Sequence, residues 1–90
     1  MLENWQAHPD EVEQIVNGQY ANPFAILGLQ QPNGIWVARA FIPHATAVSA
    51  FTRDGKPLGQ LLLRHDEGFF EGKVAIDQRQ PIRYRASNAG

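Results

Sequence analysis

The feature that most constrains the fold of this chain is a change in periodicity at Asn33. Before this residue, apolar side chains recur at helical spacing. After it, short segments with period two are separated by turn residues about every ten positions, a pattern typical of antiparallel sandwiches and barrels. Asn33-Gly34 and Asp54-Gly55 are two of these turns. Strands are predicted over residues 35–42, 46–52, 58–64, 69–76 and 82–87. The pattern therefore predicts a mostly β fold.

The first 30 residues predict a short helical cap. His8-Pro9-Asp10-Glu11 suits a helix start, because proline fits the first turn and carboxylates favour the positive end of the helix dipole. One apolar stripe follows, formed by Val12, Ile15 and Val16. Asn17-Gly18 ends this helix, and residues 22–28 predict one further helical turn. Because a helix of about two turns is marginal alone, its stripe must dock on the strands.

The chain length sets the domain organisation. Ninety residues support one small core and no deep cleft. The 43% hydrophobic and 19% charged residues predict a globular domain and exclude disorder. We therefore expect a helical cap with a connecting turn over residues 1–30 and a β-sandwich over residues 31–90, together forming one domain.

Charge and hydropathy exclude several classes of partner. The formal net charge is −1 and the chain has no run of Lys or Arg, so nucleic acid is not an expected partner. No apolar stretch approaches the roughly 20 residues that span a bilayer, and the first residues lack the features of a signal peptide. The chain has no cysteine, which excludes disulfides and thiolate sites. These features predict a cytoplasmic protein that does not bind membranes.

Alternation assigns most strand residues to a face. In the strand over 69–76, the predicted core face carries Phe70, Gly72 and Val74. The opposite face, expected to be wet, carries Phe69, Glu71 and Lys73. In the last strand, Ile82, Tyr84 and Ala86 are expected to face the core. The strand over 35–42 has large apolar groups on both faces, so it is either central in a sandwich or covered on one face by a helix or a second domain.

Four short motifs follow one another in an order that a known family shares. Residues 22–28 read Asn-Pro-Phe-Ala-Ile-Leu-Gly, residues 39–45 Arg-Ala-Phe-Ile-Pro-His-Ala, residues 68–72 Gly-Phe-Phe-Glu-Gly, and residues 84–85 Tyr-Arg. This order and spacing resemble the start of bacterial glycogen (1,4-α-glucan) branching enzymes. The resemblance extends from Val12 to Ala86, and four motifs in order within so short a chain are fairly specific.

The resemblance implies an immunoglobulin-like antiparallel β-sandwich, an association with α-glucan chains and a role in bacterial glycogen synthesis. Enzymes of that family cut an α-1,4 bond, form a covalent glycosyl intermediate and transfer the chain to a 6-hydroxyl. Their catalytic residues lie in a barrel domain, so none is carried over to this chain. We expect this chain to be a domain excised from a longer protein, or a truncated gene product, and to have no enzymatic activity alone.

The residues themselves offer little catalytic or metal-binding chemistry. Most carboxylates fall in predicted turns or in the first turn of the helix, where solvated carboxylates are ordinary, so no catalytic pair is expected. His8, His44 and His65 lack the close spacing of a metal site. No glycine-rich loop joins a strand to a helix, so phosphate binding has no support, and no cofactor is expected.

Aromatic side chains are the remaining route to function, because a sugar ring can stack on a flat ring that faces solvent, as nucleic-acid bases do. The candidate glucan contacts are Trp36 and Phe69, with Glu71 and Lys73 beside Phe69 as hydroxyl partners. The structural alternative is core packing for Trp36 and contact with the next domain for Phe69. Trp5 is a further candidate contact, and its alternative is a loose position ahead of the helix. The other aromatic residues are expected to pack: Tyr20, Phe24, Phe41, Phe51, Phe70 and Tyr84.

Three functions remain open at this point. The first is an accessory module of a branching enzyme that guides α-glucan chains or sets which chain lengths are transferred. The second is a structural module that packs on neighbouring domains of the same enzyme and never touches sugar. The third is an immunoglobulin-like protein-interaction domain with no link to glycans. The order of the motifs favours the first two.

Overall fold

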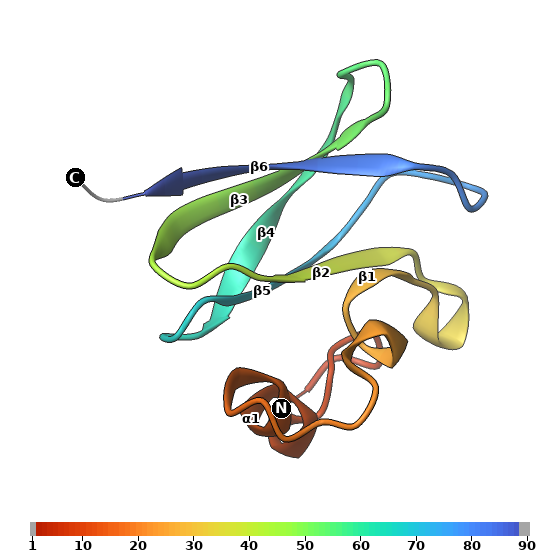
Figure 1. The fold of residues 1–90 in the computed structure, drawn as a ribbon. Coiled ribbons are helices and arrows are strands. Elements are labelled where there is room, and N and C mark those ends of the chain that lie inside the picture. The colour runs from red at the N-terminus through yellow and green to blue at the C-terminus, as the bar shows by residue number, and fades with distance from the viewer. Residues whose placement is uncertain (1, 89–90) are drawn as a thin grey trace.

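Six strands of this computed structural model, which describes residues 2–88, form one curled antiparallel sheet (Figure 1). In chain order they are β1 (Gly28–Gln30), β2 (Val37–Phe41), β3 (Ala45–Thr52), β4 (Pro57–His65), β5 (Phe69–Lys73) and β6 (Ile82–Asn88). The order across the sheet is β1-β2-β5-β4-β3-β6. The mostly β fold is confirmed, and the arrangement is sandwich-like, since β4 pairs with β3 on one side and β5 on the other.

The strand predictions hold with two differences. The fourth predicted strand ends at Lys73 rather than at residue 76. The sequence pattern also missed β1, which lies inside the range 1–30 assigned to the cap and pairs with β2 through Leu29 and Ala38. A three-residue strand that begins at a glycine carries too little alternation to be recognised.

The helical cap begins and ends where the sequence predicts. Helix α1 covers Pro9–Val16, and the His8 ring accepts a hydrogen bond from the Asp10 amide while the His8 amide donates to the Glu11 carboxylate. Two short 3-10 turns follow, η1 (Pro23–Ala25) and η2 (Pro32–Gly34). Figure 1 places α1 against the layer formed by β2 and β5, on the side away from β3 and β6.

Two apolar clusters result from this arrangement. The sandwich core lies between the layers and consists of Leu29, Ala38, Ala40, Val48, Ala50, Leu61, Phe70 and Val74. The cap core lies between α1 and the outer face of the sheet and consists of Ala7, Val12, Ile15, Ile26 and Phe69. Both faces of β2 are therefore buried, one in each cluster. Of the alternatives for this strand, the structure shows the one in which a helix covers one of its two faces.

The prediction that Phe69 faces water is wrong. Phe69 has no exposed surface, and Glu71, on the same face of β5, has none either. Phe69 lies opposite Phe41 of β2, and this pair is covered by the cap. Alternation separates the two faces of a strand correctly but does not say which of them another element covers. Phe70 and Val74 do lie in the sandwich core, as predicted.

Candidate functional site

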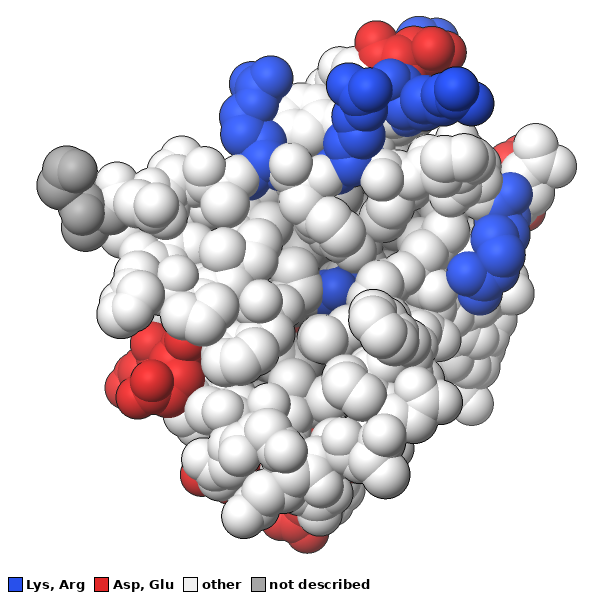
Figure 2. Space-filling model, viewed as in Figure 1, with Lys and Arg blue, Asp and Glu red and all other residues white. Residues whose placement is uncertain are grey.

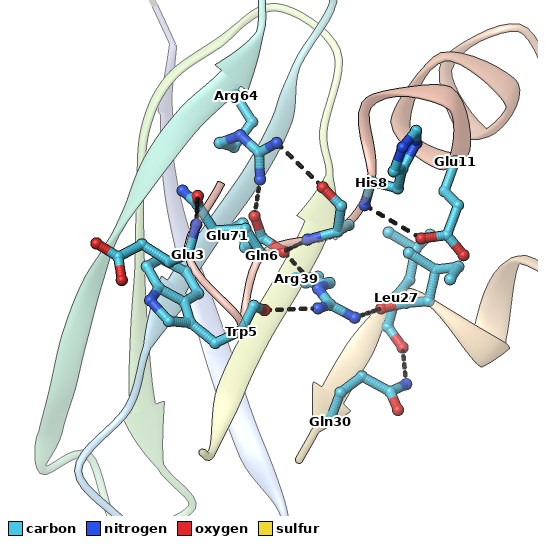
Figure 3. A network of polar contacts seen from close by, with 12 residues as sticks. Glu3, Trp5, Gln6, His8, Glu11, Leu27, Gln30, Arg39, Arg64 and Glu71 are labelled. Atoms are coloured by element: carbon cyan, nitrogen blue, oxygen red, sulfur yellow. Dashed lines mark hydrogen bonds and ion pairs between the residues drawn. The ribbon is translucent and has the colours of Figure 1, made fainter. Parts of the chain in front are cut away.

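A buried network of charged groups joins the cap to the sheet (Figure 3). At its centre is the Glu71 carboxylate of β5, which is fully buried. One of its oxygens, Oε2, accepts hydrogen bonds from Arg39 Nε at 2.6 Å and from the Ala7 amide at 2.7 Å. The other oxygen, Oε1, accepts a hydrogen bond from Arg64 of β4. Three strands of the sheet and the N-terminal segment thus meet at one carboxylate.

The remaining donors of the two arginines hold the N-terminal segment in place. Arg39 donates to the carbonyl of Trp5 at 2.8 Å and to that of Ile26 at 3.3 Å. Arg64 donates to the carbonyl of Ala7 at 3.1 Å. Because Arg presents several N–H groups in a fixed fork, one side chain can bond a carboxylate and two carbonyls at once. The backbone of the N-terminal segment is therefore fixed by side chains of the sheet.

A second polar contact joins the middle of α1 to the end of β4. His65, the last residue of β4, lies with its Nε2 3.0 Å from a carboxylate oxygen of Glu13. Both groups are partly exposed, so this pair contributes less to stability than the buried network. It connects the helix itself to the sheet, whereas the network holds the segment that precedes the helix.

The network is built for structure rather than for acid–base chemistry. Glu71 was expected to be a solvent-facing partner for sugar hydroxyls, but it is buried and its two oxygens are taken up by three donors. A carboxylate that no solvent or ligand reaches cannot exchange a proton with a substrate. Glu71 therefore positions the cap. Arg39 and Glu71 lie opposite each other on adjacent strands, and this pair of opposite charges is the feature that identifies the network. The sequence alone does not show it, because the strand pairing must be known first.

Trp36 lies at the edge of the sandwich and is half-buried. One side of its indole packs on the sandwich core, and the guanidinium carbon of Arg79 lies 5.5 Å from the ring centroid. Arg79, an exposed residue, also donates a hydrogen bond to the carbonyl of Leu29 at 3.0 Å. The structure thus brings an indole and a guanidinium together at the surface, a pair that the sequence did not identify.

The two predicted glucan contacts are not brought together. Trp36 packs against the sandwich core, whereas Phe69 belongs to the cap core on the other side of the sheet. A ring with no exposed surface offers nothing for a sugar to stack on, so Phe69 lacks the geometry that its predicted role requires. The alternative role, contact with the next domain, does not apply either, because the cap of the same chain covers Phe69.

Two further aromatic residues differ from expectation. Trp5, expected to be a contact or loose, is buried at 6% exposure with Lys73 Nζ 5.7 Å from its ring centroid. Phe24, expected to pack, is 82% exposed on the turn η1. A large apolar side chain held out by a rigid turn is typical of a contact surface.

Tyr84 closes the side of the sandwich between β6 and β2. Its hydroxyl donates a hydrogen bond to the backbone carbonyl of Arg39 at 3.3 Å, and it lies opposite the buried Ala50 in the pairing of β6 with β3. Burial raises the pKa of Tyr84 to about 12, so the hydroxyl keeps its proton and its donor role at neutral pH. The predicted inward direction of Tyr84 is thus confirmed, although the ring stays 36% exposed.

The described residues, 2–88, offer few alternatives to a contact surface. No pocket opens within this part of the chain, and no group of three or more metal-binding side chains gathers there. Within the same range no helix has the length and apolar character required to cross a membrane.

The comparison with known proteins agrees with the motifs. The family described as "alpha-1,4-glucan branching enzyme GlgB, N-terminal domain" matches residues 8–88. A 1,4-alpha-glucan branching enzyme GlgB of Rhizobium meliloti (strain 1021) is 50% identical over 80 residues, and one of Mesorhizobium japonicum is 48% identical over 84 residues. These matches cover 89% and 93% of this chain but only 11% of each enzyme, so the chain spans about a tenth of the length of these relatives. The chain belongs to the family of N-terminal domains of the alpha-1,4-glucan branching enzyme GlgB.

Proposed function

We propose that this chain is a non-catalytic module of a 1,4-α-glucan branching enzyme and that it assists the enzyme by contacting a glucan chain at Trp36 and Arg79. The family match supports the setting, because it concerns the N-terminal domain of such enzymes and about a tenth of their length. A cytoplasmic location and a role in glycogen synthesis are parts of the same proposal. So is the treatment of residues 1–30 and 31–90 as one domain.

The observation that carries the proposal is the pairing of a partly exposed indole with a guanidinium at the edge of the sandwich. Trp36 supplies the exposed part of a half-buried indole, and Arg79 lies over the ring, 5.5 Å from its centroid, with N–H groups that suit neighbouring sugar hydroxyls. The bond from Arg79 to the Leu29 carbonyl holds the guanidinium in place before a ligand arrives. Phe69 has no part in this site, because it is buried under the cap.

A site of this kind binds weakly. It has no pocket walls, so most of a bound sugar stays in water and few groups compensate for the lost freedom of the ligand. A dissociation constant on the order of a millimolar is expected for contact with one partly exposed indole and a few hydroxyl bonds. Weak contact is compatible with the role, because a site on the same enzyme as the catalytic centre acts at high effective concentration.

A structural role is the second candidate, and a specific observation favours it. Phe24, Leu62 and Leu63 are 82%, 60% and 52% exposed, which is unusual for large apolar side chains. Such residues suit contact with a neighbouring domain of the same enzyme. The two roles are compatible, since the exposed apolar residues and the Trp36–Arg79 pair are different residues.

The test of the glucan role is a titration of the isotope-labelled domain with maltoheptaose, followed through backbone amide shifts in NMR spectra. We expect shifts that cluster around Trp36 and Arg79 and saturate in the millimolar range. Arg79→Ala should weaken binding about five- to tenfold, since a hydrogen bond from a charged group contributes about 1–1.5 kcal/mol or more.

Arg83→Ala is the matched control, because it removes the same side chain from the exposed face of β6. It should leave the affinity unchanged. If maltoheptaose causes no amide shifts, the domain-packing role is the better explanation. The same holds if Arg79→Ala and Arg83→Ala reduce the shifts equally.

A further inference from the structure

The outer face of the curled sheet is covered over only half of its width. On this face Glu71 of β5 lies between Arg39 of β2 and Leu62 of β4 in the strand pairing. Arg39 and Glu71 lie under the cap at 6% and 0% exposure, whereas Leu62, the next residue across, is 60% exposed. The cap therefore reaches β4 only at its last two residues, Arg64 and His65, and leaves the rest of that strand uncovered. The sheet continues beyond it through β3 and β6.

We call the uncovered half the open face and define it by Ala47, Ser49, Phe51, Leu62, Arg83 and Arg85. In the pairing of β3 with β6, Ser49 lies opposite Arg85 and Phe51 opposite Arg83. The small side chains of Ala47 and Ser49 keep the middle of this face flat. The guanidinium carbon of Arg85 lies 4.9 Å from the Phe51 ring centroid, which fixes a charge beside an aromatic ring. A surface with an exposed leucine at one side and two arginines at the other is suited to contact with a protein.

The charge of the open face restricts its partner. Arg83 and Arg85 lie on it, and the adjoining turn between β3 and β4 adds Arg53 and Lys56 against one carboxylate, Asp54, so the region keeps a positive net charge. Figure 2 shows basic side chains along one edge of the molecule with acidic atoms among them, while the other acidic groups in view lie elsewhere on the surface. A second copy placed antiparallel on this face would bring arginines together and is disfavoured by repulsion. The face therefore suits a surface that carries Asp and Glu.

The place of this domain in its relatives identifies the partner. The chain matches an N-terminal domain and only 11% of the length of each relative, so the rest of those enzymes lies beyond the matched segment. Strand β6 leads out of the domain along the border of the open face, where Ser87 pairs with Ala47. In such an enzyme the polypeptide that follows continues from the end of β6, where Asn88 lies opposite Ala45. A following domain is thus held at high effective concentration beside it.

We propose that the open face docks against an acidic surface of the domain that follows this one in the branching enzyme. The inference rests on the proposed function, in that it takes the chain to be a module of such an enzyme. It doesn't depend on glucan binding at Trp36, which lies in the edge of the sandwich core and not on the open face. Docking would orient the module relative to the rest of the enzyme.

Cysteine labelling in a hybrid enzyme tests the docking. The hybrid is the Rhizobium meliloti branching enzyme with its matched 80 residues replaced by this chain. This chain has no cysteine, so Leu62→Cys and Leu63→Cys each add one site, which peptide mass spectrometry reads separately from cysteines elsewhere in the enzyme. The two positions are adjacent on β4 and similarly exposed, at 60% and 52%, but they point to opposite faces of the strand.

In the free domain both cysteines should react with a thiol reagent at similar rates. In the hybrid, we expect the cysteine at position 62 to react about tenfold more slowly, because a docked state favoured ten to one leaves about a tenth of the free rate. The cysteine at position 63 should react as in the free domain. Adding Arg85→Glu to the hybrid should restore the rate at position 62, since it places a negative charge against the acidic partner surface.

Equal rates at position 62 in the free domain and the hybrid would overturn the proposal. Protection of position 63 alone, or of both positions equally, would also overturn it, because the partner would then cover another face. If labelling at position 62 is slow and Arg85→Glu leaves the rate unchanged, docking does not depend on opposite charges. The choice of an acidic partner surface would then be wrong. A failed glucan titration would not affect any of these outcomes, so the two proposals fail separately.

Discussion

Replacing Glu71 by glutamine is expected to lower the free energy of unfolding by about 3–5 kcal/mol, because the removal of one member of a buried ion pair leaves its partners charged and uncompensated. Arg39 and Arg64, whose side chains are 7% and 16% exposed, would both lose their anionic partner. A domain of this size is stable by about 5–15 kcal/mol, so the loss is a large fraction of the total. Urea unfolding followed by tryptophan fluorescence measures it.

Two companion variants separate the charge from the shape of the side chain. Glu67→Gln makes the same chemical change at an exposed position in the turn between β4 and β5 and should alter stability by less than about 0.5 kcal/mol. Replacing all three charged residues together, Arg39→Met, Arg64→Met and Glu71→Leu, should restore much of the stability, since apolar substitution of a whole buried ion cluster is often neutral or better. A loss for Glu71→Gln no larger than that for Glu67→Gln would show that the network does not hold the cap.

Phe69→Ala and Phe70→Ala are each expected to cost about 3–5 kcal/mol, because each empties a fully packed aromatic site. Alternation alone predicts a large loss for Phe70 and a small one for Phe69. The structure predicts comparable losses, since Phe69 and Phe70 are 0% and 1% exposed and belong to different cores. Urea midpoints of the two variants test this directly, with Phe51→Ala, a half-buried ring on the open face, as the milder control.

Amide hydrogen exchange shows which part of the domain each of the two variants destabilises. Phe69→Ala should speed exchange in α1 more than in β3 and β6, because the cap core is lost while the sandwich core remains. Phe70→Ala should speed exchange throughout the sheet. A small effect of Phe69→Ala on both stability and exchange would mean that the cap does not cover β5 in solution.

The sequence predicts the elements of this fold well because local signals mark their ends. His8-Pro9 starts the helix and Asn17-Gly18 ends it, and both residues of the Asn33-Gly34 turn take the positive φ values that such a turn requires. What local signals lack is the position of one element against another. Phe69 and Glu71 alternate as outward-facing residues should, and only the packing of α1 makes that face a buried one. A residue that looks solvent-facing in a strand is therefore ambiguous wherever an amphipathic helix has no assigned partner.

The candidate site was predicted less completely than the fold. Trp36 is at the surface, as a glucan contact requires, but its partner Arg79 lies outside the regular strands, where no periodicity links it to the indole. The exposure of Leu62 likewise depends on where the cap ends across the sheet, which strand alternation does not encode. Both features depend on contacts between residues that are far apart in the sequence. They become visible only when the register of the strands is known.

The central claim, that this chain is a glucan-contacting module of a branching enzyme, is tested most directly by the products of the hybrid enzyme. The length distribution of the transferred branches should be compared for the hybrid, for the same enzyme without its N-terminal domain, and for the hybrid with Arg79→Ala. We predict that removal of the domain shifts the distribution and that Arg79→Ala shifts it in the same direction. Identical distributions for all three enzymes at equal total activity would contradict the claim.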